Sequence, residues 1–261
     1  MLNSDWQRLD SPVGRRNENS TMELPLPQIA PIALVTAALV LFLVVVAGTR
    51  RLAAVLSQGQ TGPRISPYLA TAVSAWALAG LVVVAIWFID QNEPVPNFVG
   101  ALVDTGVNLH GGFSTGSLAA GWMFVTAVVV SNLVQVLRRS SGSGPSDAAL
   151  NLLPRTPMEI AVWTLVLAPT AGLTEEFVYR GYLMSQVWGF VGNGWIAAAI
   201  TSVVFGFVHG YQGAWGILRT GLIGFVLAVG VLATWSLVPS MIAHILLNAF
   251  GVAFNPPARR G

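Results

Sequence analysis

The amino-acid sequence predicts an all-α, polytopic membrane helical bundle of seven or eight helices, and three observations predict it. Of 261 residues, 54% are hydrophobic and 9% are charged, whereas soluble domains carry about a quarter charged residues. Several apolar runs reach the roughly 20 residues that a helix needs to cross a hydrocarbon core. Thirteen arginines and no lysine supply the positive charge, and they lie mainly at the ends of these runs, as in membrane proteins. A nucleic-acid-binding protein is therefore not expected.

The chain divides into four parts. Residues 1–28 are polar and are interpreted as an N-terminal tail. Residues 29–156 hold three predicted spans, at about 31–49, 67–89 and 117–137, and end in the linker "RRSSGSGPSD" at 138–147, whose glycines and serines are typical of flexible segments. Residues 157–255 form a C-terminal membrane domain, and residues 256–261 form a short tail.

Charge predicts the topology. The arginine-rich connections 50–66 and 138–157 are expected on the cytoplasmic side. The acidic loop 90–116 is expected outside, and its His110 is interpreted as an ordinary loop residue. The predicted location is a bacterial cytoplasmic membrane.

The C-terminal domain contains four apolar stretches separated by glycine-rich turns, at about 157–190, 193–210, 214–233 and 238–254. A straight helix over the first stretch would be about 50 Å long, against a hydrocarbon core of about 30 Å. Pro169 and Gly172 offer a break, so the stretch is expected to form either one kinked span plus a surface helix or two shorter helices. Glycines in the third stretch are expected to allow close helix packing.

Three ionisable residues lie in the apolar segment "APTAGLTEEFVYRGYL", residues 168–183. Ionisable groups inside a membrane are costly, so they mark a functional site. Glu176 and Arg180 have the four-residue spacing and orientation of a helical ion pair, and a buried arginine needs such a partner. Glu175 points about 100° away on the helix and is free for chemistry.

Two histidines and an asparagine in other stretches complete the predicted site. Glu175 and His209 are each 17 residues from Gly192, so an antiparallel hairpin turning there would bring them together. Phe205 shares a helix face with His209, and His244 shares one with Asn248.

These residues can hydrolyse a peptide bond. Glu175 would act as general base for a water that His209 orients. His244 and Asn248 would donate hydrogen bonds to the oxyanion. The alternative is a zinc site formed by Glu175, His209 and His244. The metal-free, cofactor-free arrangement is favoured, since the HExxH motif of helical zinc proteases is absent. The lack of cysteine excludes thiolate catalysis.

The motifs "EEFVYR", "FGFVH" (205–209) and "HILLN" (244–248) occur in this order. Over about 157–254 the chain resembles the CPBP family of intramembrane proteases, which includes CAAX prenyl endopeptidases and bacteriocin-processing (Abi) proteins. The resemblance implies a bundle around an intramembrane cavity and a glutamic endopeptidase activity. It also implies catalytic roles for Glu175, His209, His244 and Asn248, supported by Glu176, Arg180 and Phe205. The implied partners are the lipid bilayer and a peptide or protein substrate, lipidated or membrane-associated.

Two other functions are compatible with buried glutamate and histidine. A proton-coupled transporter could use them as a relay, although the paired repeat halves of such transporters are not found in the sequence. An inactive homologue could serve as a membrane scaffold or immunity protein.

Overall fold

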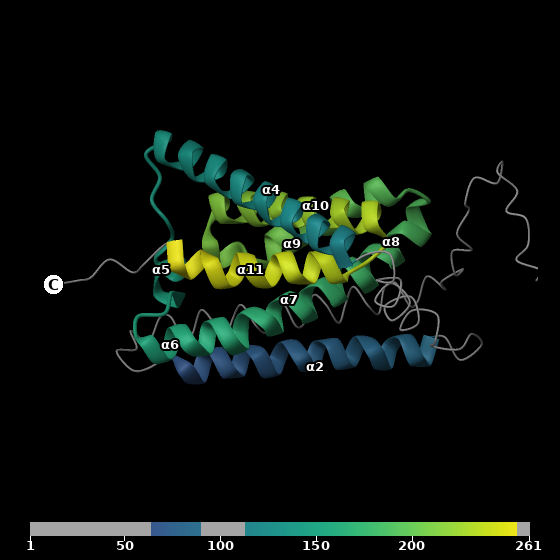
Figure 1. Ribbon diagram of the computed structural model, residues 1–261, viewed down its shortest axis with the longest axis horizontal. Coiled ribbons are helices and arrows are strands. Elements are labelled where there is room, and N and C mark those ends of the chain that lie inside the picture. The colour runs from purple at the N-terminus through teal and green to yellow at the C-terminus, as the bar shows by residue number, and fades with distance from the viewer. Residues whose placement is uncertain (1–63, 90–112, 255–261) are drawn as a thin grey trace, which may run out of the picture.

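The structure is a computed structural model that describes residues 64–89 and 113–254 (Figure 1). The predicted tail 1–28, the first predicted span and His110 lie outside this part of the chain. Within it, the α-helices are α2 (Ile65–Ile89), α4 (Phe113–Ser140), α5 (Asp147–Leu152), α6 (Pro157–Val162), α7 (Ala168–Glu176), α8 (Met184–Val191), α9 (Gly194–Val208), α10 (Ala214–Thr234) and α11 (Val238–Phe254). Two π-helical segments, η2 (Trp163–Leu167) and η3 (Phe177–Leu183), and a 3₁₀ turn, η4 (Gly210–Gln212), connect some of them.

The membrane class is confirmed by three helices that are long and apolar enough to span a bilayer. Their apolar spans are Ile65–Val84, Ser117–Ser140 and Ala214–Thr234, and two shorter apolar helices are Gly194–Val208 and Val238–Gly251. Large apolar side chains are exposed along them, among them Val73 at 69% and Leu118 at 74%. Such side chains suit hydrocarbon rather than water. The predicted spans 67–89 and 117–137 coincide with α2 and α4.

Residues 157–191 form one continuous helix, so the alternative of two shorter helices separated at Pro169 and Gly172 is wrong. The linking residues between α6, η2, α7, η3 and α8 all keep right-handed helical dihedrals. The reason is the π-helical turn just before Pro169, in which the N–H of Ala168 bonds to the carbonyl of Trp163. This wider turn accommodates a proline, which has no N–H and crowds the preceding helical turn.

Sequence signals define the two ends of this long helix. It starts with a capping box, in which Thr156 accepts from the N–H of Glu159 and Glu159 accepts from the N–H of Thr156, and with Pro157 in the first turn. It ends at Gly192, whose φ of 67° is left-handed and costs glycine no steric penalty.

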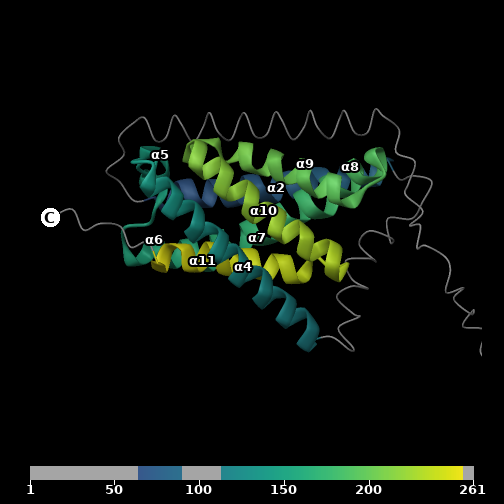
Figure 2. The ribbon, with the colours of Figure 1, turned by 90° about the horizontal axis from the view of Figure 1, so that it is seen from above.

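The helices run mostly along the long axis of the molecule (Figure 1). The long helix packs through α7 against both α2 and α11. α9 and α10 form a hairpin, and α10 also packs on α4 and α11. α4 crosses the bundle obliquely (Figure 2). The predicted site residues of the C-terminal domain thus come from three neighbouring segments, the long helix, the α9–α10 hairpin and α11.

Glu159 ties α2 to the start of the long helix. Its carboxylate accepts from the backbone N–H groups of Arg64 at 2.8 Å, Arg155 at 2.6 Å and Thr156 at 3.2 Å. Burial alone would raise its pKa, but these three hydrogen bonds and the charge of Arg64 outweigh burial and lower the pKa of Glu159. Glu159 therefore remains ionised while it joins the two helices.

Candidate active site

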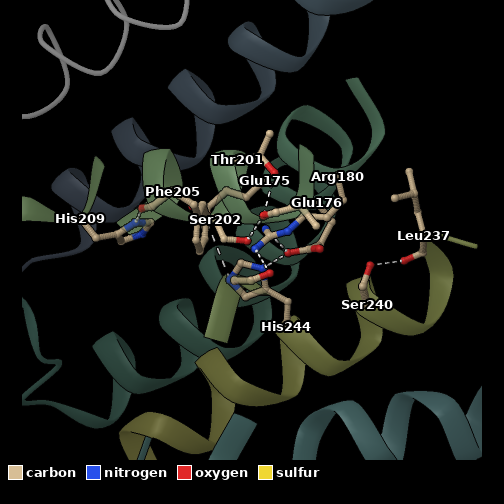
Figure 3. A network of polar contacts seen from close by, with 12 residues as sticks. Glu175, Glu176, Arg180, Thr201, Ser202, Phe205, His209, Leu237, Ser240 and His244 are labelled. Carbon is tan, nitrogen blue, oxygen red and sulfur yellow. Dashed lines mark hydrogen bonds and ion pairs between the residues drawn. The ribbon is translucent and has the colours of Figure 1, made fainter. Parts of the chain in front are cut away.

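Glu176 is the centre of a buried polar network, at the point where α7 becomes π-helical. Its side chain is fully buried, and its Oε1 atom accepts from Arg180 Nη1 at 2.7 Å and from His244 Nδ1 at 2.7 Å. Figure 3 shows the three side chains pointing toward one another from the long helix and α11. The predicted ion pair between Glu176 and Arg180 is confirmed.

Arg180 is fixed on three sides. Besides Glu176, its guanidinium donates through Nη2 to the carbonyl of Gly224 on α10 at 3.0 Å. It also lies over the Phe205 ring of α9, 4.4 Å from the centroid, a favourable cation–π arrangement. A side chain at Gly224 would place its Cβ 2.8 Å from Arg180 Nη2. Gly224 therefore leaves the space that the guanidinium occupies.

Arg180 forms its salt bridge with Glu176 and not with Glu175, as the helical spacing predicts. Its side chain is 29% exposed, and its Oε2 atom lies 3.8 Å from Nε2 of His244. His244 is 7% exposed and so lies between two carboxylates, bonded to Glu176 through Nδ1 and facing Glu175 with Nε2. Because the Glu176 carboxylate paired with Arg180 can only accept, the Nδ1 atom of His244 carries the proton of that bond.

His209 ends α9, next to the same network. Its Nδ1 atom lies 2.8 Å from the carbonyl oxygen of Phe205, and a carbonyl only accepts, so Nδ1 is protonated and Nε2 is open. Phe205 packs against His209 in a tilted arrangement with ring centroids 4.7 Å apart, and it contacts the His244 ring edge-on at 6.0 Å. His209 interacts electrostatically with Glu175 and His244. No hydrogen bond joins His209 to Glu175 among the described residues.

Asn248 lies one turn after His244 on α11. Its backbone carbonyl accepts from Trp163 Nε1 of the long helix at 2.9 Å. In the described part of the chain, its side chain makes no hydrogen bond to the other predicted site residues. The structure therefore brings Glu175, Glu176, Arg180, Phe205, His209 and His244 into one network, and it leaves Asn248 at the network's edge.

A glycine determines how closely α11 approaches the long helix. A Cβ atom at Gly172 would lie 2.9 Å from the Ile245 backbone nitrogen and 3.1 Å from the Met241 carbonyl oxygen. The two backbones can come this close because position 172 has no side chain. This contact, one turn before Glu176, brings His244 within reach of the carboxylate.

The donor set for the alternative zinc site is not assembled in this arrangement. Within the described residues, no three His, Asp or Glu side chains are placed so that they could hold a metal ion together. Of the three predicted ligands, only Glu175 and His244 face each other, through one carboxylate oxygen and one imidazole nitrogen. The metal-free mechanism stays a prediction.

Sequence reasoning missed the bond between Glu176 and His244. The helical spacing assigns Glu176 to Arg180 alone, and no signal in one sequence shows which residue of another helix shares its carboxylate. It also missed Tyr211, whose ring centroid lies 6.0 Å from that of His209.

No curated protein and no solved structure matches the chain. Residues 157–250 match the family model of the type II CAAX prenyl endopeptidase Rce1-like proteins. The matched segment starts at the first residue of the long helix and ends within α11, so it contains every residue of the buried network. Residues 157–250 are therefore similar to the type II CAAX prenyl endopeptidase Rce1-like family.

Proposed function

We propose that this domain is an intramembrane endopeptidase that hydrolyses a peptide bond with a water activated by Glu175. The family match supports an endopeptidase of the CAAX type. The observation that carries the assignment of Glu175 is its place in the network. It is the one carboxylate of the pair without a salt bridge to Arg180, and it faces an imidazole at 3.8 Å.

The open nitrogens define the proposed roles. Glu175 accepts a proton from water as the water oxygen attacks the carbonyl carbon, and it later passes that proton to the departing amine. Nε2 of neutral His209 accepts a hydrogen bond from the same water and orients it. His244 and Asn248 donate to the oxyanion of the tetrahedral intermediate. For His244, this role requires a proton on Nε2 in addition to the one on Nδ1.

Glu176 acts as a positioning residue in this scheme. Its bond to Nδ1 fixes the His244 ring so that Nε2 points toward Glu175. Arg180 keeps Glu176 ionised by pairing with it, and Phe205 packs against Arg180 and both imidazoles.

We also propose that the site opens toward the cytoplasmic half of the membrane. Along α11, His244 lies ten residues before Phe254, or about 15 Å of helix. The C-terminal end of α11 lies at the same end of the bundle as the end of α4, with Arg138 and Arg139 (Figure 1). Arginine-rich ends face the cytoplasm.

Replacement of the proposed base is the direct test. Glu175→Gln keeps the side-chain size and removes the basic oxygen, so we expect cleavage to fall on the order of 10²- to 10⁴-fold. Because Glu175 is partly exposed and outside the ion pair, thermal unfolding should be unchanged. Purified protein in detergent with a fluorogenic peptide library gives the rate, and thermal unfolding gives the stability.

Three outcomes would contradict the proposal. If Glu175→Gln cleaved peptide at the native rate, Glu175 would not be the general base. Loss of cleavage in chelator, restored by zinc, would favour the metal site of Glu175, His209 and His244. Absence of cleavage together with proton flux in liposomes would favour a transporter.

A further inference from the structure

Two arginines outside the proposed site lie at the same end of the bundle. Arg138 is in the last turn of α4, and Arg219 is in the second turn of α10. Both helix ends lie at the left end of the bundle in Figures 1 and 2. The like charges of the two guanidinium groups interact unfavourably.

Neither arginine is neutralised within the described part of the chain. No carboxylate forms a salt bridge with either one, and the Nε atoms of both are buried without a hydrogen-bond partner. Arg219 donates once, through Nη2 to Gln212 Oε1 at 3.0 Å. Two adjacent guanidinium groups with open N–H donors suit an oxyanion, which would satisfy the donors and relieve the repulsion.

Exposed leucines precede both arginines in the sequence. Leu137 is 47% exposed beside Arg138, and Leu218 is 45% exposed beside Arg219. Further exposed leucines follow toward the middle of the bundle, Leu133 on α4 at 58% and Leu222 on α10 at 41%. The two helices thus carry positive charge near the end of the bundle and exposed apolar side chains further along their length.

We infer that Arg138 and Arg219 bind the headgroup phosphate of an anionic phospholipid, whose acyl chains lie along the exposed leucines of α4 and α10. Basic positions between membrane helices on the arginine-rich side bind anionic headgroups by this chemistry. A net negative headgroup fits better than a zwitterionic one, because neither cationic group has an acidic partner among the residues that the structure describes.

The pair also contacts the loop that carries His209. The Gln212 side chain, which accepts from Arg219, donates through Nε2 to the Tyr211 hydroxyl at 3.1 Å, and the Tyr211 ring lies beside His209. A phosphate held by Arg219 would therefore fix η4 next to the proposed catalytic histidine.

Lipid binding can be measured on the full chain in detergent by native mass spectrometry. We expect the protein to bind phosphatidylglycerol in preference to phosphatidylcholine. The double variant R138Q/R219Q should bind phosphatidylglycerol on the order of 30-fold more weakly, since each arginine near the surface contributes about fivefold. The matched control is R139Q, which removes the neighbouring exposed arginine and should bind as the native chain does.

The single variant R138Q separates lost binding from misfolding. Arg138 makes no side-chain bond within the described residues, so R138Q should elute and melt as the native chain does and still bind more weakly. Equal binding of both lipids, or undiminished binding by folded R138Q/R219Q, would overturn the inference. Full competition of inorganic phosphate with the lipid would also overturn it. So would a role of Arg138 in binding the substrate carboxylate: folded R138Q would then show a raised KM for a peptide with a free C-terminus but not for an amidated one, while lipid binding is unchanged.

Discussion

Glu176 combines two functions in one buried side chain. It neutralises Arg180, which cannot lose its proton inside the membrane, and it holds His244 through Nδ1. Both bonds use the Oε1 atom, whereas Oε2 is buried without a hydrogen-bond partner among the described residues. A carboxylate in this position supports the fold and the site together, so its loss is expected to affect both.

Replacing Glu176 tests this double role. Glu176→Gln leaves Arg180 as an uncompensated buried charge, and we expect the free energy of unfolding to fall by about 3–5 kcal/mol. Cleavage should fall even at temperatures where the variant is folded, because His244 loses its anionic partner. Thermal unfolding in detergent and peptide cleavage by the folded fraction measure the two effects.

A double-variant cycle separates the ion pair from the rest. Adding Arg180→Gln to Glu176→Gln removes the stranded charge, so the combined destabilisation should be smaller than the sum of the single ones. Strict additivity would show that the two side chains do not interact.

The long helix carries its candidate site residues next to irregular turns. α7, which ends in Glu175 and Glu176, is bounded by the π-helical segments η2 and η3. Such segments often occur at functional sites. Here the first one lets the helix continue through Pro169, and the second contains Arg180. The close packing of α11 at Gly172 then decides whether His244 reaches Glu176.

Gly172→Ala tests this packing. Its Cβ would meet the backbone of Ile245 and Met241, which cannot move as a flexible side chain would. We expect a loss of about 1–3 kcal/mol of stability and weaker cleavage, since α11 must move away from α7. Thermal unfolding and peptide cleavage are again the measurements.

The matched control is Gly80→Ala on α2, where an added Cβ meets no atom within 4 Å. In a helix this change should be neutral or slightly stabilising. If both variants behaved alike, the close approach at Gly172 would not hold the site together.

At the scale of the whole molecule, charge is distributed unevenly between the two ends of the bundle. Arg64, Arg138, Arg139 and Arg155 lie where α2 and the long helix begin and α4 ends. The opposite end, at the turns around Gly192 and Ser236, has no charged residue among those described. It carries aromatic side chains instead, including the Trp188–Trp235 pair with centroids 5.7 Å apart, and tryptophans favour the membrane interface.

This asymmetry predicts the orientation in the membrane. The chain has no cysteine, so single cysteines can be labelled without background. In intact bacterial cells, a membrane-impermeant maleimide should label Asn193→Cys and should label Ser141→Cys only after permeabilisation. The opposite pattern would place the arginine-rich end and the proposed site opening outside. The lost helix cap at Asn193 costs about 1 kcal/mol, which membrane insertion should tolerate.

The sequence by itself determined the fold class, the approximate bounds of the described spans and the pairing of Glu176 with Arg180. These follow from local rules, because apolar run length fixes a membrane helix and a four-residue spacing fixes which side chains meet on it. It misjudged Pro169, because a π-helical turn depends on hydrogen bonds that no residue type signals.

Only the tertiary structure decided which residues of different helices share a partner. His244 binds Glu176 rather than Glu175 because α11 approaches α7 at Gly172 and enters the network from that side. The guanidinium of Arg180 also donates a hydrogen bond to a carbonyl of α10 and packs over an aromatic ring of α9. Contacts between helices depend on crossing angle and separation, and these are set by packing across the bundle rather than by spacing along any one helix.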